Sequence, residues 1–274
     1  MITTTRVRQH TTHNLDLAVP ALVACDIDGT LLSTGQLPTA AVRSAVERVR
    51  AAGHHVVLAT GRSLVGALDA ALKLGLDDAW IVASNGAVTA HLVGGEYEVT
   101  DRHTINPEPV VRVAVDAMPG IRVGVEVVGV GYRVNIPFPD GELNGVQQSV
   151  DAIRELWADP TPRLAIYGPA AFGLVPVLRA MGLTAIATRP DWVDVTPPAL
   201  SKATALDKVR RRLGVEYEAT AAIGDGENDV EMLRWATRSI VMGHAPAHVR
   251  AVADRATGTI DDDGAAAALL WLLG

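Results

Sequence analysis

Residues 22–32 read LVACDIDGTLL and hold the most informative pattern of this 274-residue chain. The apolar run 21–25 predicts a buried strand, and Asp26 and Asp28, directly after it, project to the same side. Two neighbouring carboxylates are costly unless a cation or a shared proton lies between them. Gly29 lets the chain turn sharply, so that backbone N–H groups can face an anion. The pattern favours a magnesium site with a nucleophilic carboxylate, although Asp and Gly also favour an ordinary turn.

The residues that follow alternate between helix and strand patterns. Apolar residues recur at helical spacing over 38–52 and 63–74, and a glycine that suits a helix end follows each segment. Short apolar runs at 55–59 and 80–83 predict two more buried strands. Three strand–helix repeats with short links predict a parallel sheet with helices on its faces. In such a sheet the chemistry lies beyond the C-terminal ends of the strands.

The middle of the chain changes character and predicts an inserted α+β module with an antiparallel sheet. In it we expect strands at 121–127, 132–135, 163–167 and 183–187, and helices at 108–118, 146–158 and 170–181. The α/β alternation then returns, with strands at 219–223 and 239–241 and helices at 201–213, 227–236, 246–253 and 264–273. The prediction is therefore an α/β core made of 17–87 and 189–274, a module over 88–188 and a frayed tail over 1–16.

Two shorter motifs offer groups that can hold an anion. Thr60 and Gly61 follow the second predicted strand and present a hydroxyl and an unobstructed N–H at the mouth of a helix. The plain alternative is a turn with Ser63 as the helix cap. Lys202 lies in a first helical turn, where a cation opposes the helix dipole unless an anion is near. Lys202 is therefore a candidate to hold phosphate, and otherwise a solvated surface lysine.

The motif GDGEND at 224–229 follows another buried strand. Asp225 fits a hard metal ligand, Asn228 can donate to a phosphate oxygen, and Asp229 is expected to orient Lys202 or the waters around a metal. The alternative is a capped helix start with acidic residues that complement the dipole. Because all of these motifs are predicted on one rim of one sheet, we expect Mg²⁺ and Lys202 to hold a dianionic phosphate against Asp26.

Composition excludes several classes of function. The chain has 24 Lys and Arg against 31 Asp and Glu, a formal charge of −7, which disfavours nucleic-acid binding. Its single cysteine, Cys25, permits no intrachain disulfide and no cysteine-based zinc site, and reads as a small buried hydrophobe. No apolar run reaches the length of a membrane span. Residues 17–25 imitate a short export signal, but Asp16 and Pro20 interrupt it and cleavage would remove a needed strand. A cytoplasmic protein is expected, and nothing in the sequence indicates an oligomeric state.

These motifs, in this order, resemble those of the haloacid dehalogenase (HAD) superfamily, specifically its Cof-type, subfamily IIB phosphatases. The resemblance spans nearly the whole chain. It rests on DIDGTLL at 26–32, ATGR at 59–62, SNGA at 84–87, SKATAL at 201–206 and GDGENDVEML at 224–233. It implies a Rossmann-like HAD-fold core with a C2-type α+β cap, and Mg²⁺-dependent phosphatase activity through an aspartyl-phosphate.

The resemblance also implies a role for each motif residue. Asp26 would be the nucleophile and a metal ligand, and Asp28 the acid/base with its backbone carbonyl on the metal. Asp225 would complete the metal site. The phosphate would be held by Ile27, Thr60, Gly61, Lys202 and Asn228. Asn85 would contact substrate or orient the first loop, and His244, where the family usually has Asn, receives no role.

The expected function is hydrolysis of small phosphorylated metabolites, either sugar phosphates or cofactors such as flavin mononucleotide or pyridoxal phosphate. A phosphomutase of the same superfamily and a non-catalytic phosphometabolite-binding protein are the alternatives. The cap is expected to set specificity by closing over the leaving group. Glu126, Arg133 and Asn135 are candidate substrate contacts there, although solvent-facing strand positions are the more common fate of such residues.

Overall fold

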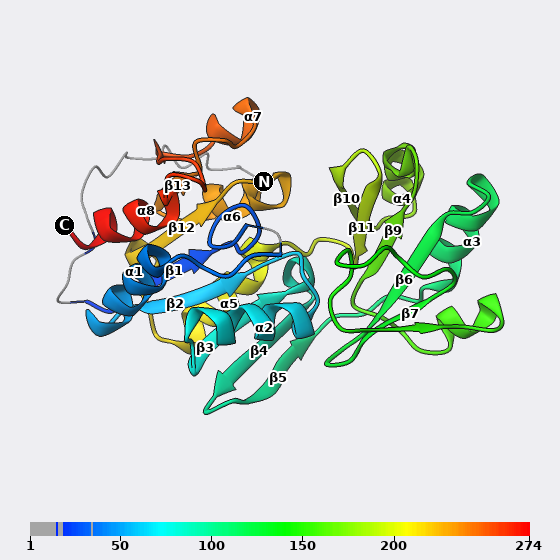
Figure 1. The fold of residues 1–274 in the computed structure, drawn as a ribbon, viewed down its shortest axis with the longest axis horizontal. Coiled ribbons are helices and arrows are strands. Elements are labelled where there is room, and N and C mark those ends of the chain that lie inside the picture. Colours follow the sequence, from blue (N-terminus) through cyan, green and yellow to red (C-terminus); the bar gives the residue numbers. More distant parts are fainter. Residues whose placement is uncertain (1–14, 16–18, 34) are drawn as a thin grey trace, which may run out of the picture.

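The computed structural model describes residues 15, 19–33 and 35–274 and divides them between two sheets. The core sheet has the strand order β14-β13-β12-β1-β2-β3-β4-β5 (Figure 1). Its parallel strands are β1 (Leu22–Cys25), β2 (His55–Ala59), β3 (Asp78–Ala83), β12 (Thr220–Gly224), β13 (Arg238–Val241) and β14 (Arg255–Ala256). The antiparallel strands β4 (Val88–Val93) and β5 (Glu96–Arg102) extend one edge. This arrangement confirms the predicted α/β core with a parallel sheet.

Helices cover both faces of the core sheet. One face packs against α1 (Ala40–Ala51), α2 (Leu64–Leu74) and α8 (Gly264–Leu273), and the other against α5 (Lys202–Arg212), α6 (Val230–Trp235) and α7 (Ala247–Arg250). The strand β1 shows why both faces are apolar: Val23 and Cys25 belong to the first layer, and Leu22 and Ala24 to the second. The cap helices are α3 (Glu108–Ala117) and α4 (Val175–Ala180).

The cap sheet has the order β10-β11-β9-β6-β7-β8 and lies to one side of the core (Figure 1). Its strands are β6 (Arg122–Val127), β7 (Gly131–Val134), β8 (Val146–Ser149), β9 (Leu164–Tyr167), β10 (Thr184–Arg189) and β11 (Trp192–Thr196). Residues of α3 and α4 pack on one face of this sheet. A second cluster, which contains Tyr132 and Trp192, covers the other. The inserted α+β module is therefore present, and all its neighbouring strands are antiparallel except β7 and β8.

The module boundaries predicted at 88 and 188 differ from the sheet topology. The strands β4 and β5 continue the core sheet, because β4 folds back on β3 through the short 3₁₀ turn Ser84–Gly86. The strand β11 belongs to the cap sheet, where it pairs with β9 and β10. Alternating apolar residues predict a strand but do not say which sheet it joins. The core therefore extends past residue 88, and the cap sheet extends to Thr196.

The helix predicted over 146–158 is wrong. Residues 146–149 form β8 beside β7, and only a 3₁₀ turn, Ile153–Trp157, follows. Gly145 at φ +84° turns the chain into this pairing. The apolar spacing is compatible with a helix, but tertiary pairing with β7 overrides it.

The expected tail lies almost wholly outside the described residues. Its one described residue, Leu15, is buried against the core, and its backbone N–H donates to the Leu272 carbonyl. In the described part of the chain, no helix is both long and apolar enough to cross a membrane.

Candidate active site

The C-terminal ends of β1, β2 and β12 meet at one rim of the core sheet, and this rim faces the cap. A cavity of about 470 Å³ lies at this rim. The core contributes Asp26, Asp28, Thr60, Gly61, Arg62, Asp225 and Asn228 to its lining, and the cap contributes Tyr132, Arg163, Trp192 and Asp194. The parallel topology thus brings motifs almost 200 positions apart to one place, as strand order predicts.

Behind Asp26, a buried lysine connects two carboxylates. Lys202, at the start of α5, is fully buried, and its Nζ donates to Asp26 Oδ1 and Asp229 Oδ1, each at 2.6 Å. Burial opposes the charge on Lys202, but Asp229 and Asp26 outweigh it and raise the pKa of the ammonium. Lys202 can donate three hydrogen bonds, and these two contacts use two of them. The solvated surface lysine considered above is excluded.

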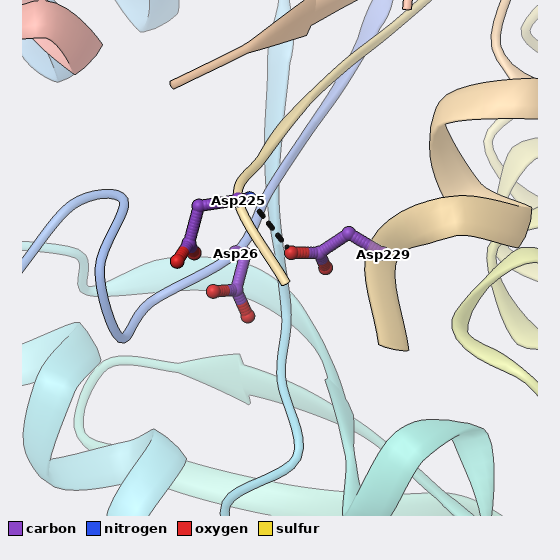
Figure 2. A group of neighbouring side chains, drawn as sticks. All are labelled: Asp26, Asp225 and Asp229. Atoms are coloured by element: carbon purple, nitrogen blue, oxygen red, sulfur yellow. Dashed lines mark hydrogen bonds between the residues drawn. The ribbon is translucent and has the colours of Figure 1, made fainter. Parts of the chain in front are cut away.

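Asp229 uses both of its carboxylate oxygens inside the protein. Oδ1 accepts from Lys202, and Oδ2 accepts from the backbone N–H groups of Asp225 and Gly226, each at 2.9 Å. Figure 2 shows Asp229 pointing toward the loop that carries Asp225. These bonds join Lys202 to the loop that carries Asp225, and the orienting role of Asp229 stays a prediction.

The oxygens around Asp26 and Asp225 fit a hard divalent cation. Asp26, Asp225 and Asp229 each place a carboxylate oxygen within 4.8 Å of the others. Both oxygens of Asp229 already accept hydrogen bonds, whereas Asp26 Oδ2 accepts none in the described structure, so Asp26 and Asp225 are the better candidates for a cation. A Cβ on Gly29, which has φ +78°, would lie 2.4 Å from Asp225 Oδ2, so only glycine leaves this space free. All of these donors are oxygen atoms, which Mg²⁺ prefers.

The charges of the site favour a cation as well. Burial, and then the neighbouring Asp229, raise the pKa of Asp26 well above its ordinary value. Burial and Asp229 also raise the pKa of Asp225 to about 6. Thr30 Oγ1 donates to Asp225 Oδ1, and His244 Nε2 lies 3.6 Å from Asp225 Oδ2. Carboxylates that resist ionisation together are stabilised by a cation placed between them.

Asp28 lies at the cavity in a forked ion pair with Arg62. The Nε and Nη2 atoms of Arg62 donate to the two oxygens of Asp28 at 2.7 and 2.6 Å. Two parallel bonds fix both the position and the plane of the carboxylate. Arg62 is a site residue that the sequence reading missed, although it lies within the quoted ATGR motif. A basic residue directly after a predicted anion loop was the signal.

The phosphate-holding candidates surround Asp26 at the same rim. Thr60 is buried, and its Oγ1 accepts from the Arg62 N–H at 3.1 Å. The Ile27 carbonyl accepts from Thr30 and Leu32, which closes the turn after β1. A Cβ on Gly61 would lie 3.3 Å from Asn228 Nδ2, which places these two residues side by side. The structure thus brings all five candidates together, and their individual roles stay predictions.

Asn85 lies between the rim and the cap. Its Oδ1 accepts from Asn228 Nδ2 at 2.9 Å, and its Nδ2 donates to Asp194 Oδ2 at 3.2 Å. From the sequence, Asn85 is expected to contact substrate or to orient the first loop. Its side chain instead contacts Asn228, in the last acidic loop. Burial by these neighbours leaves it only 2% exposed, so it lies behind the cavity wall.

The cap residues differ from expectation. Glu126 is buried at the contact with the core, where it accepts from Ser84 Oγ at 2.6 Å and from the Leu64 N–H at 3.4 Å. Arg133 pairs with Asp159, and Asn135 holds the backbone of the cap hairpin. None of these three lines the cavity.

The cap face of the cavity is built instead around a buried ion pair that the sequence reading missed. Arg163 donates from Nε and Nη2 to Asp194 Oδ1, at 2.9 and 2.7 Å, and from Nη1 to the Tyr132 hydroxyl. Trp192 Nε1 also donates to Asp194 Oδ1. The sequence offers one sign of this ion pair: Asp194 lies between Val193 and Val195 in an apolar strand. A charge buried in such a strand needs a partner of opposite charge.

Comparisons with known proteins agree with this site. The family described as haloacid dehalogenase-like hydrolase matches residues 23–118 and 177–269, more than half of the chain. A putative phosphatase, M6_Spy0533 of Streptococcus pyogenes, is 28% identical over 92% of this chain and 98% of its own length. The 5-amino-6-(5-phospho-D-ribitylamino)uracil phosphatase YitU of Bacillus subtilis is 27% identical over 90% and 95%. The solved structure of the HAD subclass IIB sugar phosphatase BT4131 superposes with a TM-score of 0.77 at 27% identity, covering 91% of this chain and 98% of that one.

Proposed function

Because this chain belongs to the haloacid dehalogenase-like hydrolases and is a phosphoric monoester hydrolase, we propose that it hydrolyses small phosphorylated metabolites through an aspartyl-phosphate on Asp26. The observation that carries the proposal is the buried Lys202 that bridges Asp26 and Asp229. One oxygen of Asp26 is held by the ammonium, which orients the other for attack at the cavity.

Mg²⁺ is the proposed cofactor. Asp26, Asp225 and the backbone carbonyl of Asp28 would hold it, and when bound it neutralises charge on the transferring phosphoryl group. The donor set and the space left by Gly29 support this assignment.

The chain's own residues account for the two half-reactions. An oxygen of Asp26 bonds to phosphorus while the bond from phosphorus to the leaving oxygen breaks, and Asp28 donates a proton to that oxygen. Asp28 then removes a proton from water, whose oxygen bonds to phosphorus and releases inorganic phosphate and free Asp26. Lys202, Thr60 and Asn228, with the backbone N–H groups of Ile27 and Gly61, would hold the phosphoryl oxygens throughout. Asp28 has to leave its pair with Arg62 to carry the proton.

The substrate is proposed to be a phosphorylated sugar or polyol. The names of two relatives, a sugar phosphatase and a phosphatase of a ribityl compound, support this class. The polar cap face, with Arg163, Tyr132 and Asp194, supports a hydroxyl-rich leaving group. Flavin mononucleotide and pyridoxal phosphate remain in the substrate panel. Because free metabolite phosphates are expected as substrates, we also propose a cytoplasmic location.

Phosphate release from p-nitrophenyl phosphate tests the reaction, and a panel of sugar, polyol and cofactor phosphates tests the substrate. The wild type is expected to release phosphate with Mg²⁺ and to stop when EDTA is added, whereas Asp26→Asn is expected to be inactive. Equal turnover by both proteins would defeat the assignment of the nucleophile. Isomerisation of a hexose phosphate without phosphate release would instead indicate a mutase.

A further inference from the structure

A line of side-chain amides connects the cap to the phosphate site. Asp194 of β11 accepts from Asn85 Nδ2, and Asn85 Oδ1 accepts from Asn228 Nδ2. Asp194 and Asn85 are 4% and 2% exposed, so water does not compete for the bond between them, whereas the bond from Asn228 is partly buried. Asn228 is the last of these three residues. It is the one that the proposed function places against the phosphate.

The chemistry of Asp194 sets the direction of every bond in the line. As a carboxylate paired with Arg163, Asp194 only accepts hydrogen bonds. The group of Asn85 that faces it must therefore be the NH₂, which turns the Asn85 oxygen toward Asn228. Asn228 must in turn present its own NH₂ on that side. The orientation of the Asn228 amide is thus set by a carboxylate of the other module.

The backbone around Asn85 holds this arrangement in place. Ser84 and Asn85 have φ +51° and +53°, and the Asn85 N–H donates to the Thr60 carbonyl. A Cβ on Gly86 would lie 2.3 Å from the Ser201 carbonyl, so the turn is pressed against the start of α5. A Cβ on Gly61 would lie 3.2 Å from Asn85 Oδ1. Such strained positions persist only where the surroundings impose them.

We propose that Asp194 and Asn85 are positioning residues for the phosphoryl-transfer reaction, which act by orienting the Asn228 amide toward the phosphate. The proposal rests on the proposed function. Its consequence is that the phosphate site is complete only while β11 of the cap lies against the rim, so that cap contact and phosphate binding are coupled.

The test is a double-mutant cycle with p-nitrophenyl phosphate as substrate and inorganic phosphate as inhibitor. Asn85→Gly removes the link and keeps the positive φ, and it leaves the buried Asp194–Arg163 pair intact. In the wild-type background we expect kcat/KM to fall about 10-fold, mainly through KM, with a parallel rise in the inhibition constant of phosphate. In the Asn228→Ala background the same change is expected to alter both constants less than about twofold.

Asp194→Asn provides the second arm, because its amide places a donor against the Asn85 donor while preserving shape. Its effect on phosphate inhibition should also vanish in the Asn228→Ala background. The matched control is Glu126→Gln, which alters another contact between cap and core, at Ser84, and should act equally in both backgrounds. Equal effects of Asn85→Gly in both backgrounds would overturn the proposal. If Asn228→Ala itself leaves kcat/KM unchanged, the phosphate-binding role of Asn228 in the proposed function fails instead.

Discussion

The surroundings of Asp26 make its ionised form unfavourable, although the proposed reaction needs Asp26 ionised. It is 5% exposed and lies beside Asp225 and Asp229, and the ammonium of Lys202 offsets part of their combined charge. A nucleophilic carboxylate has to remain ionised even where burial and neighbouring carboxylates disfavour its charge. If Asp26 is the nucleophile, as proposed, it must react from a place where burial makes its ionised form unfavourable without a neighbouring cation.

Asp26→Asn is therefore expected to abolish phosphatase activity and to stabilise the protein in EDTA. Because the pKa of Asp26 is raised in the folded state, the neutral and isosteric amide removes a charge that folding disfavours at neutral pH. The melting temperature measured by calorimetry should rise by about 2–4 °C per kcal/mol gained. A lower melting temperature in EDTA would contradict this reading of the site. Excess Mg²⁺ should reduce the difference, because it stabilises the wild type more.

At the scale of elements, the loops after β1 and β12 form one unit. Gly29 approaches Asp225 so closely that no side chain fits between them, and Thr30 donates to the same carboxylate. Both loops leave neighbouring parallel strands, which hold them in register. The turn after β1 thus shapes the proposed metal site as well as supplying Asp26 and Asp28.

Gly29→Ala is expected to weaken the response to Mg²⁺ strongly. The new Cβ would lie 2.4 Å from Asp225 Oδ2 and would displace that carboxylate. We expect the Mg²⁺ concentration for half-maximal activity to rise by about 10-fold or more, since ligand displacement costs affinity on that scale. Gly53→Ala is the matched control, because Gly53 also has positive φ, +85°, but nothing lies within 4 Å of its Cβ position. Similar changes in both variants would show that backbone strain alone is responsible.

At the scale of the whole molecule, the cap rests on the core through buried polar groups. Glu126 enters from β6 and bonds Ser84 and Leu64, next to the link from Asp194 to Asn85. Burial, opposed by Arg163 and Ser84, raises the pKa of Glu126 above its ordinary value of 4.5. Folding therefore favours the protonated form of Glu126 at the contact between the modules.

This contact predicts a pH dependence of stability. The folded-state pKa of Glu126 is raised above 4.5. The stabilising contribution of the protonated carboxyl is therefore complete below about pH 4.5 and is lost as the pH rises through the raised folded-state pKa. The melting temperature of the wild type minus that of Glu126→Gln should become more negative between about pH 4 and pH 8. Gln preserves the shape, can accept from Leu64 and can donate to Ser84. A difference that stays constant across this range would contradict the assignment.

Several features of this protein follow from local sequence alone. The run before Asp26 and the apolar spacing over 38–52 predict β1 and α1 closely, because buried strands and amphipathic helices have periods that can be counted. Once the strands are known to be parallel, their C-terminal ends share an edge. The gathering of Asp26, Thr60, Asp225 and Asn228 at one cavity is then a consequence of topology.

The remaining features depended on tertiary contacts between distant residues. Residues 146–149 became a strand only because β7 lay beside them, and Glu126 turned inward because the core supplied Ser84. The bonds from Arg62 to Asp28 and from Asp194 to Asn85 join segments that are 34 and 109 positions apart. No local period encodes such pairs: the first forms when two loops of the core meet at one rim, and the second only when the cap packs on the core. The motifs thus indicated phosphoric monoester hydrolysis, and tertiary packing decided which side chains contact the motif residues.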